Sequence, residues 1–185
     1  MVKRQSPLTV QITNGYLSAI MDDVNIGNMY DEENRFVVRD ELTIDSLDED
    51  TRLDAYLDVK EFVGMINNPK YSSQVDDVSF WERLSESNHG FHILGQRFWG
   101  ARTELLKDKS KNISIGGFYK VSYAFDGFGL YTKMLNDIVS EFEPAEVFVK
   151  NNNVFILTGD ELKKYKEELE KPKTKDDDSD YSEEI

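Results

Sequence analysis

The sequence predicts an α+β protein built from copies of one unit, in which a helix lies beside extended strands. Three stretches, residues 14–24, 59–67 and 129–142, place apolar residues three and four positions apart, as an amphipathic helix does. Stretches next to each of them alternate apolar and polar residues, which is typical of half-buried strands. Because the two patterns recur together, we expect repeated structural units.

The first unit begins with the helix over residues 14–24, for which Asn14 is the expected N-cap. An extended run over residues 35–39 follows it. The alternation from Leu53 to Asp58 then predicts a half-buried strand that leads directly into the second helix. The apolar stripe of the first helix consists of Leu17, Ile20, Met21 and Val24.

The second unit contains the helix over residues 59–67. We expect this helix to end before Pro69, because proline disfavours helical geometry at the residue before it. Residues 90–99 are rich in aromatic side chains and predict a strand or a hairpin. The apolar stripe of this helix consists of Val59, Phe62, Val63 and Ile66.

The third unit has the clearest pattern. Residues 119–125 predict a strand, residues 126–129 a turn and residues 129–142 a helix, which Pro144 stops. Residues 146–158 predict a β-hairpin with Asn151–Asn153 as its loop, and Asp160 is the expected cap of a last helix. The helical stripe consists of Leu130, Met134, Leu135, Ile138, Val139 and Phe142.

Shifts in composition divide the chain into two domains, a connector and a tail. The polar stretch 104–117 ends in two glycines and is the expected connector. It separates a first domain, residues 1–103, from a partial second domain, residues 118–170. The acidic segment 171–185 has little apolar surface to offset the cost of ordering, so we expect it to be disordered.

Two roles are open for this acidic tail. Three lysines and six acids give it a net charge of −3, which suits a solubilising segment. It also carries Tyr181 and Ile185, so the alternative is a short peptide ligand.

Composition excludes several classes of protein. The 185 residues carry 22 Lys and Arg against 36 Asp and Glu, a formal net charge of −14. At 39% hydrophobic residues the chain has enough apolar material for a core, so it is not wholly disordered. The absence of cysteine excludes disulfides, thiol catalysis and thiolate metal sites. Without an apolar run of membrane-spanning length or a signal-peptide pattern, we expect a cytoplasmic protein.

The sequence also lacks the motifs of an enzyme. There is neither a glycine-rich phosphate loop nor a nucleophile elbow. His89 and His92 lie three apart in a predicted strand and would point to opposite faces, which disfavours a shared metal ion. Carboxylate runs such as Asp22–Asp23 and Asp48–Asp50 are typical of solvated loops. We therefore expect a non-catalytic protein without a metal or cofactor.

The order of the predicted elements resembles that of a known family. Residues 24–39, 54–66, 87–99 and 146–156 carry the likeness. In them a helix, strands and a strand leading straight into a second helix follow one another and recur. This order is similar to that of the sliding clamps of T-even-type tailed phages, the DNA polymerase processivity factors, with a shortened second domain.

The resemblance implies a processivity fold of repeated βαβββ units with antiparallel sheets, whose helices line a hole around duplex DNA. Such a clamp is not an enzyme. It closes as a homo-oligomer, here a trimer, and tethers a replicative polymerase or a transcription partner after a clamp loader has placed it, in the host cytoplasm if the protein is viral. The residues that match the DNA-facing cations are Lys60, Lys70 and Lys133. Those that match the partner-peptide groove are Leu105, Leu106 and Ile113.

Two other functions fit the composition. An acidic interaction protein, or a DNA mimic, would bind a basic host factor without encircling DNA. A single-stranded DNA-binding protein would stack bases on its aromatic side chains. Few cations flank those aromatic residues, so we expect most of them in the core.

Overall fold

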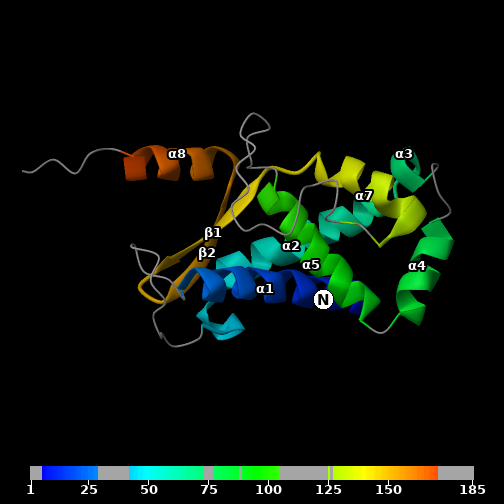
Figure 1. The fold of residues 1–185 in the computed structure, drawn as a ribbon, viewed down its shortest axis with the longest axis horizontal. Coiled ribbons are helices and arrows are strands. Elements are labelled where there is room, and N and C mark those ends of the chain that lie inside the picture. The colour runs from blue at the N-terminus through cyan, green and yellow to red at the C-terminus, as the bar shows by residue number, and fades with distance from the viewer. Residues whose placement is uncertain are drawn as a thin grey trace, which may run out of the picture.

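The computed structural model describes residues 6–28, 42–72, 77–87, 89–104, 125 and 127–170. These residues form a mixed α+β structure that is mostly helical, with one two-stranded antiparallel sheet among them (Figure 1). The elements in chain order are α1 (Pro7–Asn28), the 3₁₀ turn η1 (Ile44–Ser46), α2 (Glu49–Ile66), α3 (Pro69–Ser72), α4 (Asp77–Glu86), α5 (Gly90–Glu104), the 3₁₀ turn η2 (Gly129–Tyr131), α7 (Thr132–Val139), β1 (Ala145–Lys150), β2 (Asn153–Thr158) and α8 (Gly159–Glu170).

The helices α1 and α5 touch backbone to backbone at two glycines. A Cβ atom on Gly15 would lie 1.9 Å from the carbonyl oxygen of His92. A Cβ atom on Gly95 would lie 1.9 Å from the carbonyl oxygen of Ile12. Only glycine lets the two backbones approach this closely, so these two residues set the distance between α1 and α5.

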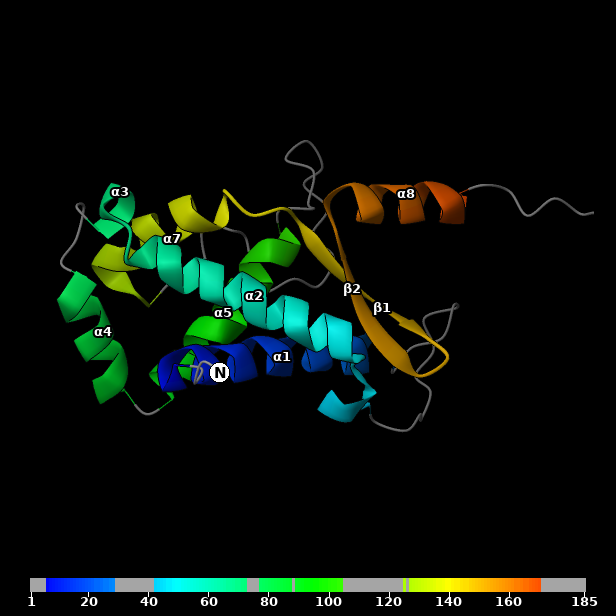
Figure 2. The same cartoon turned by 180° about the vertical axis from the view of Figure 1, so that it is seen from behind.

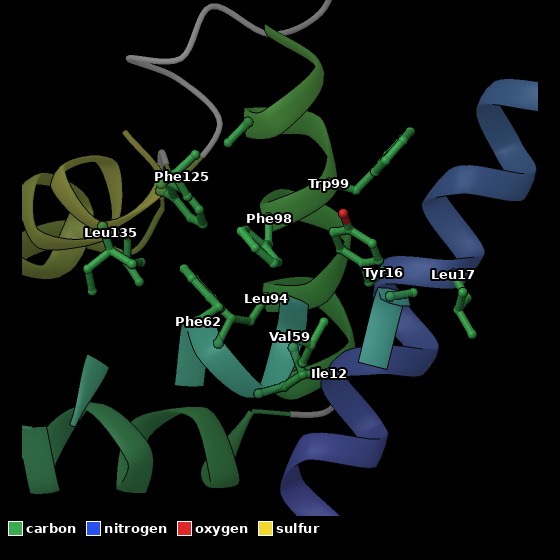
Figure 3. Packing of buried hydrophobic residues seen from close by; sticks show 14 of the residues in the cluster. Ile12, Tyr16, Leu17, Val59, Phe62, Leu94, Phe98, Trp99, Phe125 and Leu135 are labelled. Carbon is green, nitrogen blue, oxygen red and sulfur yellow. The ribbon is translucent and has the colours of Figure 1, made fainter. Parts of the chain in front are cut away.

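One hydrophobic core joins α1, α2, α4, α5 and α7 (Figure 3). At its centre the ring of Phe62 on α2 stacks on Phe98 of α5, with centroids 4.1 Å apart. The ring of Tyr16 on α1 lies 5.1 Å from Phe98. Residues on both sides of the predicted connector contribute to this core, while nearly all of the connector lies outside the described residues.

The strand predicted over residues 53–58 is wrong, because these residues lie within α2. The helix starts from Asp48, whose side chain caps it by accepting a hydrogen bond from the Thr51 N–H. Leu53 and Leu57, which a strand would bury, are 53% and 47% exposed. The buried stripe of α2 keeps the helical period over its whole length and consists of Thr51, Ala55, Val59, Phe62 and Ile66.

The strand or hairpin predicted over residues 90–99 is also wrong, because α5 contains all of it. Leu94, Phe98 and Ala101 are fully buried at positions i, i+4 and i+7, which is helical spacing. The glycines that weaken the helical signal of this segment include Gly95, which the contact with α1 requires.

The first helix is longer than predicted. It begins at Pro7, a residue favoured at the first helical position, so Asn14 lies inside α1 and does not cap it. Its predicted apolar stripe is confirmed as buried and consists of Leu17, Ile20, Met21 and Val24.

The third helix is confirmed in its centre. Met134, Leu135, Ile138 and Val139 are buried in α7. Leu130 lies in η2 before the helix and is 81% exposed, so its place in the predicted stripe is wrong.

The predicted hairpin is confirmed. Strands β1 and β2 pair in antiparallel register from Ala145 opposite Thr158 to Lys150 opposite Asn153. Asn151 and Asn152 form the turn with φ of 53° and 63°, the left-handed geometry that asparagine tolerates. The last helix, α8, begins at Gly159, so Asp160 lies in its first turn and is not the cap.

The predicted repeat of βαβββ units is not confirmed. Two of the predicted strands are helical, and the three helical stripes pack into the single core. The predicted extended runs 35–39 and 119–124, and the acidic tail 171–185, lie outside the described residues. None of the described helices combines the length and the apolar character needed to cross a membrane.

Candidate functional site: an acidic groove

The C-terminal half of α1 and the segment that leads into η1 form an open groove of about 380 Å³. We call it the acidic groove, because the exposed carboxylates of Asp22 and Asp45 are both part of its lining. The buried side chain of Met21 and the partly exposed Ile44 supply apolar surface. The remaining lining residues are Ser18, Asn25, Leu42 and Thr43.

Asn25 fixes the wall of the groove to α1. Its Nδ2 donates to the carbonyl oxygen of Leu42 at 3.0 Å, and its Oδ1 accepts from the Leu42 N–H at 2.9 Å. At the far end of η1, Leu47 is 2% exposed and forms a parallel bridge with Val154 of β2. The wall is therefore held at both ends while Ile44 between them stays 42% exposed.

Negative charge dominates the elements around the groove. Residues 6–28 and 42–51 hold no Lys or Arg. The C-terminal turn of α1 also has no basic residue, so the negative end of its helix dipole is unopposed within α1. The acidic side chains and the negative end of this helix dipole would both attract a bound cation. The acids of these two segments are Asp22, Asp23, Asp45, Asp48, Glu49 and Asp50.

Asp48, at the start of α2, keeps its charge through local hydrogen bonds. Its Oδ1 accepts from the Thr51 N–H at 2.7 Å and its Oδ2 accepts from the Thr51 hydroxyl at 2.8 Å. Partial burial works to raise the pKa of Asp48, but these hydrogen bonds outweigh it and lower that pKa below its ordinary value.

A second group of titratable residues lies inside the protein and is structural. The Arg102 side chain is 2% exposed and donates through Nη1 to the Tyr16 hydroxyl at 2.8 Å and to the Asp58 carboxylate. Its Nε donates to the carbonyl oxygen of Glu143 at 3.1 Å. Burial raises the pKa of Tyr16 and of Asp58, and Arg102 opposes both rises. Tyr16 is fully buried and the Asp58 side chain is 29% exposed, so the network links α1, α2 and α5 and reaches the surface only at Asp58.

The three lysines predicted to face DNA lie in different surroundings. Lys60 is exposed on α2. Lys70 of α3 donates to Glu141 at 2.9 Å, and this contact with a second one from Tyr71 lowers the pKa of Glu141. Lys133 pairs with Asp137 at 2.6 Å along α7. Two of the three charges are thus partly neutralised, and their DNA-facing role stays a prediction.

Other predicted site residues lie elsewhere or outside the described part. Leu105, Leu106 and Ile113, expected in the partner-peptide groove, are not among the described residues. His89 and His92 lie at the start of α5 rather than on a strand. The described residues contain no group of three or more His, Asp or Glu side chains that could hold a metal ion.

In the sequence, Asp22 and Asp48 stand out only as parts of carboxylate runs typical of solvated loops, and no motif marks the groove. The signal that could have found it is the lack of any Lys or Arg along residues 6–28 and 42–51. The bond between Asn25 and Leu42, 17 residues apart, has no sequence signature. Neither the family models, nor the curated proteins, nor the solved structures match this chain.

Proposed function

We propose that this protein is a non-catalytic, acidic interaction protein that binds a basic segment of a partner protein in the acidic groove. The observation that carries the proposal is the pair of exposed carboxylates, Asp22 and Asp45, beside apolar surface, on the described segments 6–28 and 42–51, which contain no Lys or Arg. Such a surface attracts Lys or Arg side chains and gives their apolar neighbours a place to pack. The basic cleft of a nucleic-acid-binding protein has the required chemistry. A protein that bound such a cleft would act as a DNA mimic.

The apolar part of the groove gives the proposal its specificity. An acidic surface alone attracts any basic protein, and salt screens that attraction. Ile44 is 42% exposed on a wall that Asn25 and Leu47 hold in place. A partner that also buries this side chain would therefore keep part of its affinity at high salt, whereas a purely cationic chain would lose it.

The sliding-clamp function is the competing prediction, and three features of the structure disfavour it. Two of the passages that carry the resemblance to sliding clamps lie mainly in helices, residues 54–66 in α2 and residues 87–99 in α5. The apolar faces of α1, α2 and α7 pack into one core. Finally, Lys70 and Lys133 already pair with carboxylates, so they would neutralise DNA phosphates only partly.

The test uses a cationic amphipathic peptide of Lys and Leu, with oligolysine of the same charge as its comparison. We expect the peptide to shift the amide resonances of Asp22, Asn25 and Ile44 and to retain more affinity than oligolysine as salt rises. Reversing both groove charges, Asp22→Lys with Asp45→Lys, should weaken binding about tenfold or more, since close charge pairs across an interface contribute one to several kcal/mol.

The matched control reverses two exposed acids of α8, Glu161→Lys with Glu168→Lys, which makes the same change in net charge. If the control weakens binding as much as the groove variant does, the attraction comes from overall charge and the groove has no special role. Duplex DNA offered in place of the peptide should cause no shifts around the groove.

A further inference from the structure

A second pocket, of about 270 Å³, opens between α4, α5 and the turn before α7, and its charge is the opposite of the acidic groove. Arg83 and Arg97 are among the described residues that line it, and no carboxylate is. We call it the arginine pocket. Its other lining residues are Phe80, Leu84, Ser87, Gly90, Ile93, Gly127, Phe128 and Tyr131.

Aromatic packing gives this pocket a firm floor. The rings of Phe80 and Tyr131 lie with centroids 4.9 Å apart, and both side chains are at most 7% exposed. A Cβ atom on Gly90 would lie 2.4 Å from the Leu84 carbonyl oxygen, so the start of α5 is pressed against α4. At the rim Ile93 is 37% exposed, although it is a large apolar side chain. The pocket therefore offers apolar and aromatic surface beside the guanidinium group of the exposed Arg83 and that of the half-buried Arg97, which already has an interaction within the chain.

This combination selects an anionic segment that carries an aromatic side chain. Guanidinium groups bind carboxylates through directed, charge-assisted hydrogen bonds, and they also stack on aromatic rings. The chain itself contains such a segment. Residues 176–184 read Asp-Asp-Asp-Ser-Asp-Tyr-Ser-Glu-Glu, with Tyr181 among acids and no cation.

The geometry favours the tail of a second molecule over that of the same one. Helix α8, which the tail follows, and α4 lie at opposite ends of the molecule in both views (Figures 1 and 2). The 22 residues of α1, about 33 Å of helix, lie between these ends. From Glu170 to Tyr181 a fully extended chain spans about 36–40 Å, so a tail could reach its own pocket only at its limit.

We propose that the arginine pocket binds the acidic segment 171–185 of a second copy of this chain, with Tyr181 against the aromatic floor and its flanking acids on Arg83 and Arg97. The contact is small and partly ionic, so the association should be weak and should weaken further as salt rises. It joins two different surfaces, the tail of one copy and the pocket of the next.

Sedimentation of the full chain over a range of concentrations tests the proposal. We expect reversible association that weakens about tenfold or more in Arg83→Glu with Arg97→Glu, in Tyr181→Ser, and in a chain that lacks residues 171–185. The matched control is Arg52→Glu with Lys60→Glu, which changes the same charges on the exposed face of α2 and should leave association unchanged.

A mixing experiment separates the two sources of the tail. The chain without its tail keeps the pocket, and the double arginine variant keeps the tail, so the mixture should associate although neither protein does alone. The proposal is overturned if the full chain does not associate, if these variants associate as well as the full chain, or if the mixture fails to pair. Tyr181→Ser serves as the second variant in case the change at the half-buried Arg97 disturbs folding.

Discussion

Arg102 links three helices through its side chain. From α5 its guanidinium reaches Tyr16 of α1 and Asp58 of α2, and its Nε reaches the Glu143 carbonyl after α7. It also lies 5.6 Å from the centre of the Phe142 ring, a cation–π distance. Each of these polar groups would lose its partner if the guanidinium were removed.

We expect Arg102→Met to lower the free energy of unfolding by about 3 kcal/mol, because it leaves the buried Tyr16 hydroxyl and the largely buried Asp58 carboxylate without their partner. Urea denaturation at neutral pH measures the change. Arg52→Met removes an exposed arginine from α2 and should stay within about 0.5 kcal/mol of the parent protein. Equal effects of the two substitutions would show that the Arg102 network adds nothing to stability.

Asp48 predicts a pH effect that can be separated from its capping role. Its pKa in the folded protein lies below the ordinary 3.8, so its contribution to stability is present above that value and is lost as pH falls through the folded pKa. Asn caps a helix as well as Asp but does not titrate. Asp48→Asn should therefore match the parent near neutral pH and lose less stability on acidification.

Thermal unfolding between about pH 6 and about pH 3 measures this difference. Asp48→Ala removes the cap as well as the charge and should cost stability over the whole range, by about 1 kcal/mol near neutral pH. If Asp48→Asn and the parent lose stability in parallel as the pH falls, the carboxylate of Asp48 does not contribute to the acid sensitivity of the fold.

At the scale of elements, the sequence predicts those parts whose pattern is local. The hairpin of β1 and β2 follows from two apolar runs around asparagines, and the buried face of α7 follows from its spacing. The sequence pattern predicts a strand followed by a helix where the structure has the single helix α2. Leu53 and Leu57 alternate with Asp residues as in a strand, but they are exposed on the helix. The neighbouring elements that pack on this segment decide between a strand and a helix, and the spacing of residues in the sequence does not identify them.

In helix α5 the role of the glycines likewise depends on spatial contacts that the sequence does not contain. The sequence predicts a strand or a hairpin over residues 90–99 from their aromatic side chains, and Gly90, Gly95 and Gly100 lower the helical propensity of the segment. In the structure Gly95 meets the backbone of α1 and Gly90 that of Leu84, while a Cβ atom on Gly100 would have nothing within 4 Å. Contacts between different helices therefore explain two of these glycines, and contacts between different elements also form the acidic groove that the sequence does not reveal.

These glycines give a matched pair of substitutions within one helix. Gly95→Ala would place a Cβ atom 1.9 Å from the Ile12 carbonyl oxygen, so α1 and α5 must separate, and we expect a loss of about 3 kcal/mol. Gly100→Ala meets open space and should add about 0.5–1 kcal/mol through helical propensity. Chemical denaturation of both variants measures the difference, and two effects of the same sign would contradict the close approach of the helices.

At the scale of the whole molecule, two pockets with linings of opposite charge lie apart along the long axis. The acidic groove lies where α1 ends, whereas the arginine pocket lies where α5 begins, beside α4 (Figure 2). The net charge of −14 conceals this arrangement, so composition alone predicts an acidic surface but neither of the two sites. This separation would allow the proposed partner and the proposed second copy to bind without competing for one surface.

The oligomeric state of the chain without residues 171–185 separates association through the tail from the closed ring that a sliding clamp requires. An interaction protein whose copies associate through their tails should then have the mass of a single chain at every concentration tested, because its core is complete within one molecule. A clamp closes through its folded domains, so a trimer should persist without the tail. Light scattering during size exclusion, repeated at high salt, distinguishes these outcomes. A salt-resistant trimer of the shortened chain would favour encirclement of DNA and would contradict an association that depends on the tail.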